Sequence, residues 1–261
     1  MRVLGAVALV TGASSGVGRA VAMALAEAGA ELVLHGRDRA RLAEVADCTG
    51  GVPLLADLSS ADGVEQLAER ALALRGRLDV LVASAGQGWA GPFTDMDSTD
   101  LDALVGLNLL APMRLTRVLL PGMLERGHGH LALVGSVAGR TGVAGEAVYA
   151  ASKAGLDGFA ESLRLELSGS GVSVSLTLPG AVDTPFFANR GRPYDRTVPK
   201  PVPADVVAAA VLDAVRRDRA EVWTPGWLRV ASAVRAVAPG AYRRLSARYG
   251  EPVRSRAEVP R

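Results

Sequence analysis

Residues 6–18 read AVALVTGASSGVG, an apolar run that leads into a glycine-rich turn and then into an alanine-rich segment. The run Ala6–Val10 predicts a strand buried on both faces, and the segment near 16–29 predicts a helix. The glycines let the backbone turn tightly and approach a pyrophosphate, whose charge then lies at the helix N-terminus. Their spacing is Gly-x3-Gly-x-Gly, which differs from the commoner Gly-x-Gly-x-x-Gly fingerprint of dinucleotide-binding folds. A turn without a ligand is the alternative.

Short Val/Leu-rich runs alternate with longer segments rich in Ala, Leu, Arg and Glu, which indicates repeated β-α units. The expected strands are Ala6–Val10, Glu31–His35, Val52–Ala56, Leu78–Ser84, Gly129–Gly135, Ser173–Leu178 and Glu221–Thr224. The expected helices lie near 16–29, 38–47, 61–74, 99–126, 147–168 and 203–217. This pattern predicts the α/β class, with a seven-stranded, mostly parallel sheet and helices on both faces.

Two stretches break the alternation. Residues 185–202 carry four prolines and three aromatic side chains, and they are too long for a simple connector, so we expect a lid or substrate loop. Residues 226–249 mix Trp, Leu and Val with arginines. Three interpretations of that segment stay open, namely a helix packed on the domain or a subunit partner, a cover over the pocket, and a membrane-surface anchor.

Charge divides the chain into two parts. From Gly226 onward there are eight arginines and two glutamates, a net charge of +6, so the first 225 residues carry −4 of the total of +2. The basic character belongs to the tail, and we expect no nucleic-acid groove. No Ser/Gly linker divides the chain, so we predict one catalytic domain over residues 1–225 and a basic, helical C-terminal extension over 226–261.

Composition also limits the function classes. A single cysteine, Cys48, excludes an intrachain disulfide and fits a reducing compartment. With only three scattered histidines we expect no metal site. No apolar run approaches the roughly 20 residues that span a bilayer, and no small-residue cleavage site precedes Thr11, so we expect a soluble, cytoplasmic protein.

Only two of the 29 basic side chains are lysines, and one of them, Lys153, follows Tyr149 by four residues. Residues i and i+4 share a face of a helix, so the two side chains would project together. An ammonium beside a phenol favours the phenolate and lets tyrosine transfer protons near neutral pH. A chance Tyr/Lys pair on a solvated helix face is the alternative.

The end of the second expected strand bears on the choice of nucleotide. A carboxylate there would bind a ribose 2′-hydroxyl, but the sequence places Gly36 at that point and Arg37 next. An arginine can pair with a 2′-phosphate through charge-assisted bonds worth about 1.5–3 kcal/mol. We therefore expect NADP(H) to be preferred over NAD(H). Asp38 is expected to cap the following helix.

Further motifs follow in order along the chain. They are Thr11-Gly12-x3-Gly16-x-Gly18, Asp57-Leu58, Asn108, Ser136, Tyr149-x3-Lys153 and Pro179-Gly180-x-Val182-x-Thr184. Together, over about residues 4–225, they resemble the short-chain dehydrogenase/reductase family. The resemblance implies a doubly wound Rossmann fold, an NADP-dependent oxidoreductase acting on a carbonyl or secondary alcohol, and a homodimer or homotetramer. A non-catalytic NADPH-binding regulator on the same fold is the alternative.

The resemblance also implies a role for each matched residue. Tyr149 would be the general acid/base, Lys153 would lower the pKa of the phenol, and Ser136 would hold the substrate oxygen. Asn108 would anchor a water that relays protons to Lys153. Asn108 could equally mark a kink before Pro112. The cofactor-binding residues would be Gly12, Ser14, Ser15, Gly16, Val17, Gly18, Arg37, Asp57, Leu58, Ala85, Gly86, Tyr149, Lys153, Pro179, Gly180, Val182 and Thr184.

The sequence departs from the family pattern at two points. The usual Asn-Asn-Ala-Gly is Ala83-Ser84-Ala85-Gly86 here, so we expect Ser84 or water to satisfy the backbone groups that the first asparagine would brace. Ser15 stands where some NADP-preferring relatives carry a basic residue, so the NADP expectation depends mainly on Arg37, with Ser14 as a helper.

The expected substrate pocket is aromatic. Its candidate lining comprises Trp89, Phe93, 143–146, Phe186, Phe187 and Tyr194. This composition favours an apolar or aromatic carbonyl over a sugar or a phosphorylated metabolite. Three nearby arginines (Arg190, Arg192 and Arg196) leave a carboxylate or a thioester carrier open. Substrate identity, stereochemistry and physiological direction are not fixed by the sequence.

Overall fold

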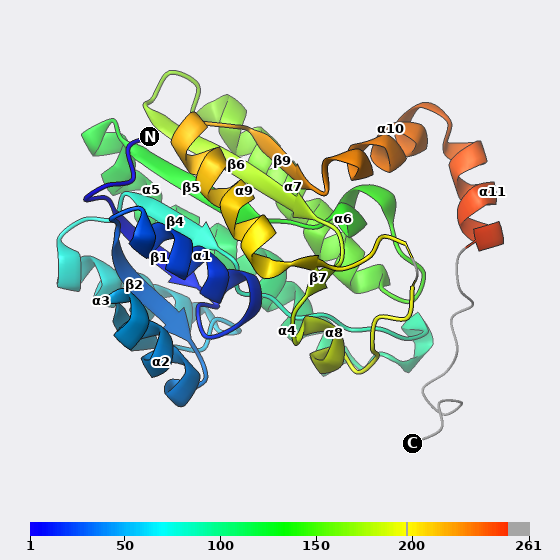
Figure 1. The fold of residues 1–261 in the computed structure, drawn as a ribbon, viewed down its shortest axis with the longest axis horizontal. Coiled ribbons are helices and arrows are strands. Elements are labelled where there is room, and N and C mark those ends of the chain that lie inside the picture. The colour runs from blue at the N-terminus through cyan, green and yellow to red at the C-terminus, as the bar shows by residue number, and fades with distance from the viewer. Residues whose placement is uncertain (197, 250–261) are drawn as a thin grey trace.

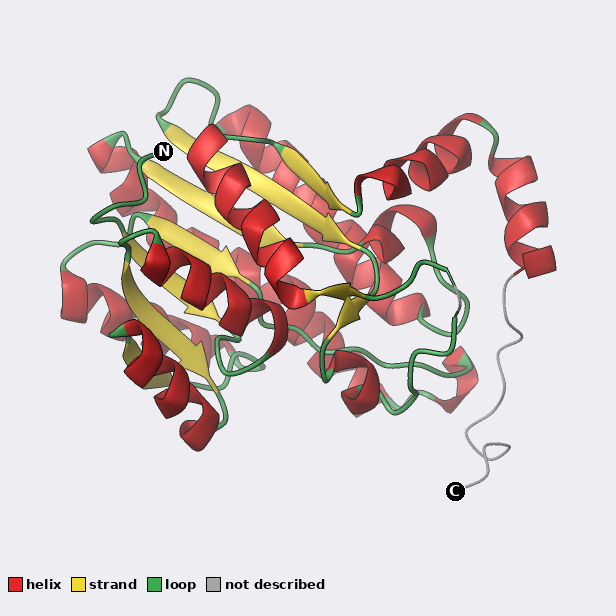
Figure 2. Cartoon of the chain, in the orientation of Figure 1, coloured by secondary structure: helices red, strands yellow, loops and turns green. Residues whose placement is uncertain are grey.

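The computed structural model describes residues 1–196 and 198–249 and contains a central seven-stranded sheet (Figures 1 and 2). The strand order is β3-β2-β1-β4-β5-β6-β9, and every neighbouring pair is parallel, which confirms the predicted α/β Rossmann architecture. The strands are β1 (Val7–Thr11), β2 (Glu31–Gly36), β3 (Val52–Leu55), β4 (Val80–Ala83), β5 (Gly129–Val134), β6 (Val172–Pro179) and β9 (Glu221–Thr224). Because the order reverses at β1/β4, the carboxyl ends of these strands border a crevice that can accept a ligand.

Helices cover both faces of the sheet (Figure 1). One face packs on α1 (Gly16–Glu27), α2 (Arg39–Thr49) and α9 (Ala204–Arg217). The other packs on α3 (Ala61–Arg75), α5 (Ala111–Arg126) and α7 (Ala147–Glu166). The helices α1 and α9 lie side by side on the same face of the sheet. In the sequence, 176 residues separate the end of α1 from the start of α9.

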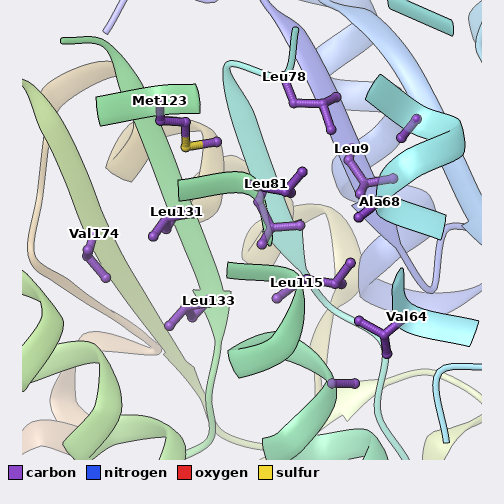
Figure 3. Packing of buried hydrophobic residues seen from close by; sticks show 14 of the residues in the cluster. Leu9, Val64, Ala68, Leu78, Leu81, Leu115, Met123, Leu131, Leu133 and Val174 are labelled. Carbon is purple, nitrogen blue, oxygen red and sulfur yellow. The ribbon is translucent and has the colours of Figure 1, made fainter. Parts of the chain in front are cut away.

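The core consists of branched aliphatic side chains from continuous apolar strands. Figure 3 shows Leu81, Leu131 and Leu133 of the sheet facing Leu115 and Met123 of α5. Complete burial of such a side chain stabilises the fold by about 1.5–3 kcal/mol. The apolar strand pattern therefore reflects a sheet that is buried on both faces.

The predicted single helix over 99–126 is interrupted. It consists of α4 (Ser98–Val105), a π turn η2 (Gly106–Leu110) and α5. Pro112 has no N–H to donate to the carbonyl of Asn108, so one α-helical hydrogen bond is missing at this point. The π turn lets the Asn108 side chain leave the helix and bond to the loop after β4.

The same stretch, Ser98–Arg126, is the one helical segment in the described part of the chain that is long and apolar enough to cross a membrane, because an 18-residue window within it has a mean hydropathy of 1.4. This finding differs from the expectation that no such run exists. Leu115, Leu119 and Met123 of this segment are buried in the core, as in the core helix of a globular protein. Length and hydropathy are therefore weak evidence of a span.

Residues 185–202 were expected to form a loop but contain short regular elements. The helix α8 (Phe186–Asn189) opens the segment, and β8 (Val202–Pro203) closes it by pairing in parallel with β7 (Val182–Asp183). After β9 the chain forms η3 (Gly226–Leu228), α10 (Arg229–Val237) and α11 (Pro239–Tyr249). The remaining short elements are η1 (Phe93–Asp95) and α6 (Val137–Thr141).

Candidate active site

A cleft of about 1210 Å³ lies at the carboxyl edge of the sheet. Every residue that the sequence predicts to contact a nucleotide lines it, from the glycine-rich turn to Thr184. Ser136, Tyr149 and Lys153 line it as well. Parallel strands end at one edge, so motifs spread over more than 170 residues of sequence meet there.

The glycine-rich turn between β1 and α1 is too tight for side chains. Gly12 has a φ of +70°, and a Cβ there would lie 2.9 Å from the Cα of Ala85. A Cβ on Gly18 would lie 2.3 Å from the carbonyl oxygen of Gly12. Within the described part of the chain, the Ser15 side chain makes no hydrogen bond that caps α1. The first turn of α1 lines the cleft, and its N–H groups without a side-chain cap suit a pyrophosphate.

The end of β2 places Gly36 and Arg37 next to each other in the cleft lining. A Cβ on Gly36 would lie 3.0 Å from the Ser14 side chain, so a carboxylate at position 36 would displace that serine. Arg37 is exposed on the cleft and forms no ion pair within residues 1–196 and 198–249. Asp38 caps α2 through the Arg41 N–H at 3.0 Å and pairs with the Arg41 side chain, which confirms its predicted capping role.

Asp57 lies beside Arg37 at the same corner of the cleft. Its carboxylate accepts hydrogen bonds from the Ser59 N–H at 3.0 Å and the Ser59 hydroxyl at 2.8 Å. These bonds, with a smaller contribution from the charge of Arg37, hold the pKa of Asp57 below its usual value. The Asp57 carboxylate is therefore a negative charge held near the positive charge of Arg37. Its oxygens can still accept hydrogen bonds from a ligand, because Ser59 uses only part of their accepting capacity.

His35 is a buried site residue that the sequence analysis did not single out. Its Nε2 lies 3.1 Å from the carbonyl oxygen of Ala56, which can only accept, so Nε2 carries the hydrogen. Nδ1 then accepts from the N–H of Gly12 at 3.5 Å. Burial lowers the pKa of His35 and keeps the ring neutral, so this side chain ties the glycine-rich turn to the end of β3.

Thr11 braces the loop after β4, a role expected for Ser84 or water. The Thr11 hydroxyl oxygen accepts from the N–H groups of Ser84 at 3.1 Å and Ala85 at 3.0 Å, and it donates to Val82 O at 3.3 Å. One hydroxyl can make all three bonds because it has one hydrogen and two lone pairs. The backbone groups that a family asparagine would hold are thus satisfied from β1.

Tyr149 lies in the first turn of α7 and faces Ser136, the N-cap residue of α6, to which its phenol is hydrogen-bonded. Burial raises the pKa of the phenol to about 12, with the nearby Glu146 carboxylate acting in the same direction. Ser136 and the Arg190 charge oppose this rise. The net direction is opposite to the lowering expected from Lys153, so the side chains of this chain alone favour the neutral phenol.

Lys153 lies one turn after Tyr149 on the same face of α7, as the i,i+4 spacing predicts. Its ammonium is buried and donates to the carbonyl oxygen of Val134 at 3.0 Å. Burial lowers the pKa of Lys153 to about 8, so the ammonium stays charged at neutral pH. One of its three hydrogens is thus held by the end of β5, which points the head group toward the cleft floor.

Asn108 lies behind the cleft floor instead of lining it. Its Oδ1 accepts from the Gln87 N–H at 2.9 Å, and its Nδ2 donates to the Gln87 carbonyl at 2.8 Å and to Ser152 Oγ at 3.3 Å. The side chain is 3.1 Å from the position of a Cβ on Gly86, and Lys153 Nζ is 3.7 Å from the same point. Asn108 therefore holds the loop after β4 next to the lysine.

Aromatic rings form the other end of the cleft. Trp89, Phe186, Phe187 and Tyr194 line it, as predicted. Successive ring centroids lie 5.5 Å apart from Tyr149 to Phe186, 5.5 Å from Phe186 to Phe187, and 4.7 Å from Phe187 to Tyr194. Phe93 is an exception, since its side chain is 61% exposed and it is absent from the described lining.

A buried ion pair closes this aromatic end. Arg190, in the segment after α8, bonds to Glu146, which immediately precedes α7, and their side chains are only 5% and 10% exposed. Arg190 also donates to the backbone of Arg192 and stacks over Phe187 at 4.7 Å. Arg196 approaches Glu146 to 3.9 Å. These residues are predicted near the pocket, but the 44 residues between Glu146 and Arg190 leave no local sequence signal of their pairing.

Comparisons with known proteins agree with the fold. The family model described as short chain dehydrogenase matches residues 6–195. The chain therefore belongs to the short-chain dehydrogenase/reductase family of oxidoreductases. A ketoacyl reductase of Nostoc sp., HetN, is 36% identical over 228 residues, which cover 84% of this chain and 78% of that protein.

Solved structures of the family share the whole fold. A short-chain dehydrogenase/reductase from Burkholderia phymatum in complex with NAD has a TM-score of 0.84 and 26% identity, covering 97% of this chain and 99% of that one. A short-chain dehydrogenase from Sphingobium yanoikuyae in complex with NADPH has a TM-score of 0.79 and 30% identity, with coverages of 98% and 100%. One of these two neighbours is thus in complex with NAD and the other with NADPH.

Proposed function

We propose that this chain is an NADP-dependent oxidoreductase that interconverts an apolar carbonyl compound and the corresponding secondary alcohol. The observation that carries the proposal is the placement of Ser136, Tyr149 and Lys153 in one cleft with the glycine-rich turn. Gly12 and Gly18 leave room that a Cβ would fill, so the turn fits a dinucleotide pyrophosphate. A bound nicotinamide supplies or accepts the hydride. Residues 1–225 would form the catalytic domain.

The three side chains divide the proton chemistry. Tyr149 donates its phenolic proton to the carbonyl oxygen of the substrate, and Ser136 holds that oxygen by a hydrogen bond. Lys153 supplies a fixed positive charge one helical turn away, which stabilises the phenolate left behind. Asn108 acts as a positioning residue because it holds the loop that borders Lys153.

The pKa of Tyr149 sets the direction of pH dependence. At a pKa of about 12 the phenol is protonated at neutral pH, which suits reduction of a carbonyl. Alcohol oxidation needs the phenolate, whose fraction rises about tenfold for each pH unit below that pKa. We therefore expect the oxidation rate to increase steadily with pH while reduction stays flat near neutrality. A pH profile measured in both directions checks this.

NADP preference is proposed from the corner formed by Ser14, Gly36 and Arg37. Gly36 leaves no carboxylate to repel a 2′-phosphate, and Arg37 has no competing ion pair in the described ranges. The Sphingobium neighbour binds NADPH and the Burkholderia neighbour binds NAD, so family membership alone does not choose between them. The choice depends on the local charge.

The substrate is proposed to be an apolar or aromatic carbonyl compound. The rings of Trp89, Phe186, Phe187 and Tyr194 offer a large apolar surface beside Tyr149. The buried Arg190 is held by Glu146 and by backbone oxygens, so this arginine needs no charge from the substrate. The Nostoc relative, named as a ketoacyl reductase, is consistent with a carbonyl substrate.

Fluorescence titration with NADPH and NADH, followed by turnover on a panel of ketones and secondary alcohols, tests the proposal. Tyr149→Phe should reduce turnover by roughly two to four orders of magnitude while NADPH affinity stays within a few-fold of the parent. Retention of activity in that variant would disprove the proton-transfer role. NADPH binding without turnover on a broad panel would favour a cofactor-sensing regulator.

A further inference from the structure

The segment 226–249, here called the tail, leaves the sheet edge after β9 as η3, α10 and α11. Figure 1 shows the last two helices extending beyond the sheet, with α11 packed on α10. Leu228 is the anchor of the tail, because it is 4% exposed and its Cδ1 lies 2.6 Å from the position of a Cβ on Gly180, a cleft residue. Arg235 of α10 donates to the carbonyl oxygen of Arg140 in α6. The tail is therefore fixed beside the cleft.

The outer face of α10 is apolar. Trp227, Val230 and Val237 are 52%, 59% and 87% exposed. With Val234 they follow the spacing i, i+3, i+7, i+10, which forms a single stripe along a helix. Leu228 and Arg235, which hold the tail to the body, lie on the opposite side of the helix wheel. None of the nine residues of α10, all of which are described, is buried.

The charge of the tail identifies what this apolar stripe can meet. Residues 226–249 contain five arginines and no acidic residue. Two of them, Arg243 and Arg244, are exposed on α11. A second copy of the tail would bring like charges together across a two-fold contact, which opposes self-association. A tail that combines an apolar stripe with arginines and has no acidic residue instead matches the boundary between the acyl chains and the anionic headgroups of a lipid surface.

We propose that the tail binds the surface of an anionic membrane, with Trp227 and Val230 inserted at the headgroup level and the arginines on lipid phosphates. The helices lie in the interface and do not span it, since α10 has nine residues and α11 has eleven. Because Leu228 packs on Gly180, the bound tail holds the mouth of the cleft close to the bilayer. Such a position suits an apolar substrate dissolved in lipid, and that last step alone depends on the proposed function.

Co-sedimentation with vesicles tests the proposal on the full chain. We expect binding to vesicles of phosphatidylcholine mixed with phosphatidylglycerol, little binding to phosphatidylcholine alone, and release by salt. Arg243→Gln/Arg244→Gln should weaken binding by roughly five-fold for each arginine. Arg2→Gln/Arg216→Gln removes the same charge from exposed positions outside the tail and should leave binding within two-fold.

Tryptophan fluorescence provides a second readout. Trp89 and Trp223 are buried or partly buried, so a blue shift on addition of the anionic vesicles reports Trp227. Trp227→Phe should abolish the shift and keep most of the binding, whereas Trp227→Ser should weaken binding by on the order of ten-fold.

The proposal is overturned by absent binding to the anionic vesicles at low salt, or by equal losses in the tail and control arginine variants. It is also overturned if Arg243→Gln/Arg244→Gln changes the sedimentation velocity of the lipid-free protein and not its vesicle binding, because the stripe would then contact a second copy. Circular dichroism confirms that each variant is folded without reference to cofactor binding, so failure of the proposed activity leaves the vesicle result intact.

Discussion

Replacement of Arg190 by methionine tests how the aromatic end of the cleft is held. The methionine keeps an apolar stem against Phe187 but removes the charge that pairs with Glu146. Both side chains are nearly inaccessible to water, at 5% and 10% exposure, so the carboxylate would stay buried with only the more distant Arg196, at 3.9 Å, near it. Breaking a buried ion pair in this way costs about 3–5 kcal/mol.

The loss of unfolding free energy can have two measurable consequences. If the segment after α8 keeps its place, a loss of about 3 kcal/mol lowers the melting temperature by roughly 6–12 °C. If Glu146 takes a proton or the segment opens, the loss is smaller and the cleft becomes more accessible. The double variant Glu146→Gln/Arg190→Met has neither of the two buried charges, so it should recover most of the loss.

The same substitutions should shift the pH profile of alcohol oxidation in opposite directions. The Glu146 charge raises the pKa of Tyr149 and the Arg190 charge lowers it. Arg190→Met should therefore move the rising limb to higher pH, and Glu146→Gln should move it to lower pH. Arg192→Met is the matched control. The Arg192 side chain pairs with Asp195 at 3.5 Å, and its charge is not among the influences on the pKa of Tyr149. A melting temperature and a pH profile equal to those of the control would refute the electrostatic argument.

Three further substitutions have expected outcomes. Burial lowers the pKa of His130 to about 4, so the stability that it contributes is present above its ordinary value and is lost as pH falls. Urea unfolding should show the parent losing roughly 2 kcal/mol more than His130→Gln between about pH 7 and about pH 5. Arg37→Gln should weaken NADPH binding by about 10- to 100-fold and leave NADH binding unchanged, as measured by fluorescence titration. Gly18→Ala places a Cβ 2.3 Å from a backbone oxygen and should abolish NADPH binding, whereas Gly158→Ala on α7, with nothing within 4 Å, should retain it.

Features set by local sequence were predictable. Strands such as β1 (VALVT) and β4 (VLVA) are apolar runs between turn residues, and burial on both faces of a parallel sheet favours that pattern. Tyr149 and Lys153 are one helical turn apart, so their shared face of α7 was predictable from their spacing. The tight glycine-rich turn was predictable because it is formed by residues close together in the sequence. Asp38 capping α2 is local in the same sense.

Features set by contacts between distant segments were not predictable. Thr11 bonds to Ala85 across 74 residues, and Glu146 pairs with Arg190 across 44. The sequence around Thr11 or Glu146 does not indicate the partner, because a hydroxyl or a carboxylate accepts a hydrogen bond from any donor that the fold brings near. The π turn at Asn108 follows the same logic, because the chain leaves the α-helical pattern to satisfy the backbone of Gln87, 21 residues away. A family motif therefore fixes which residues reach the cleft, while the bonds that hold them there depend on the packing of this particular chain.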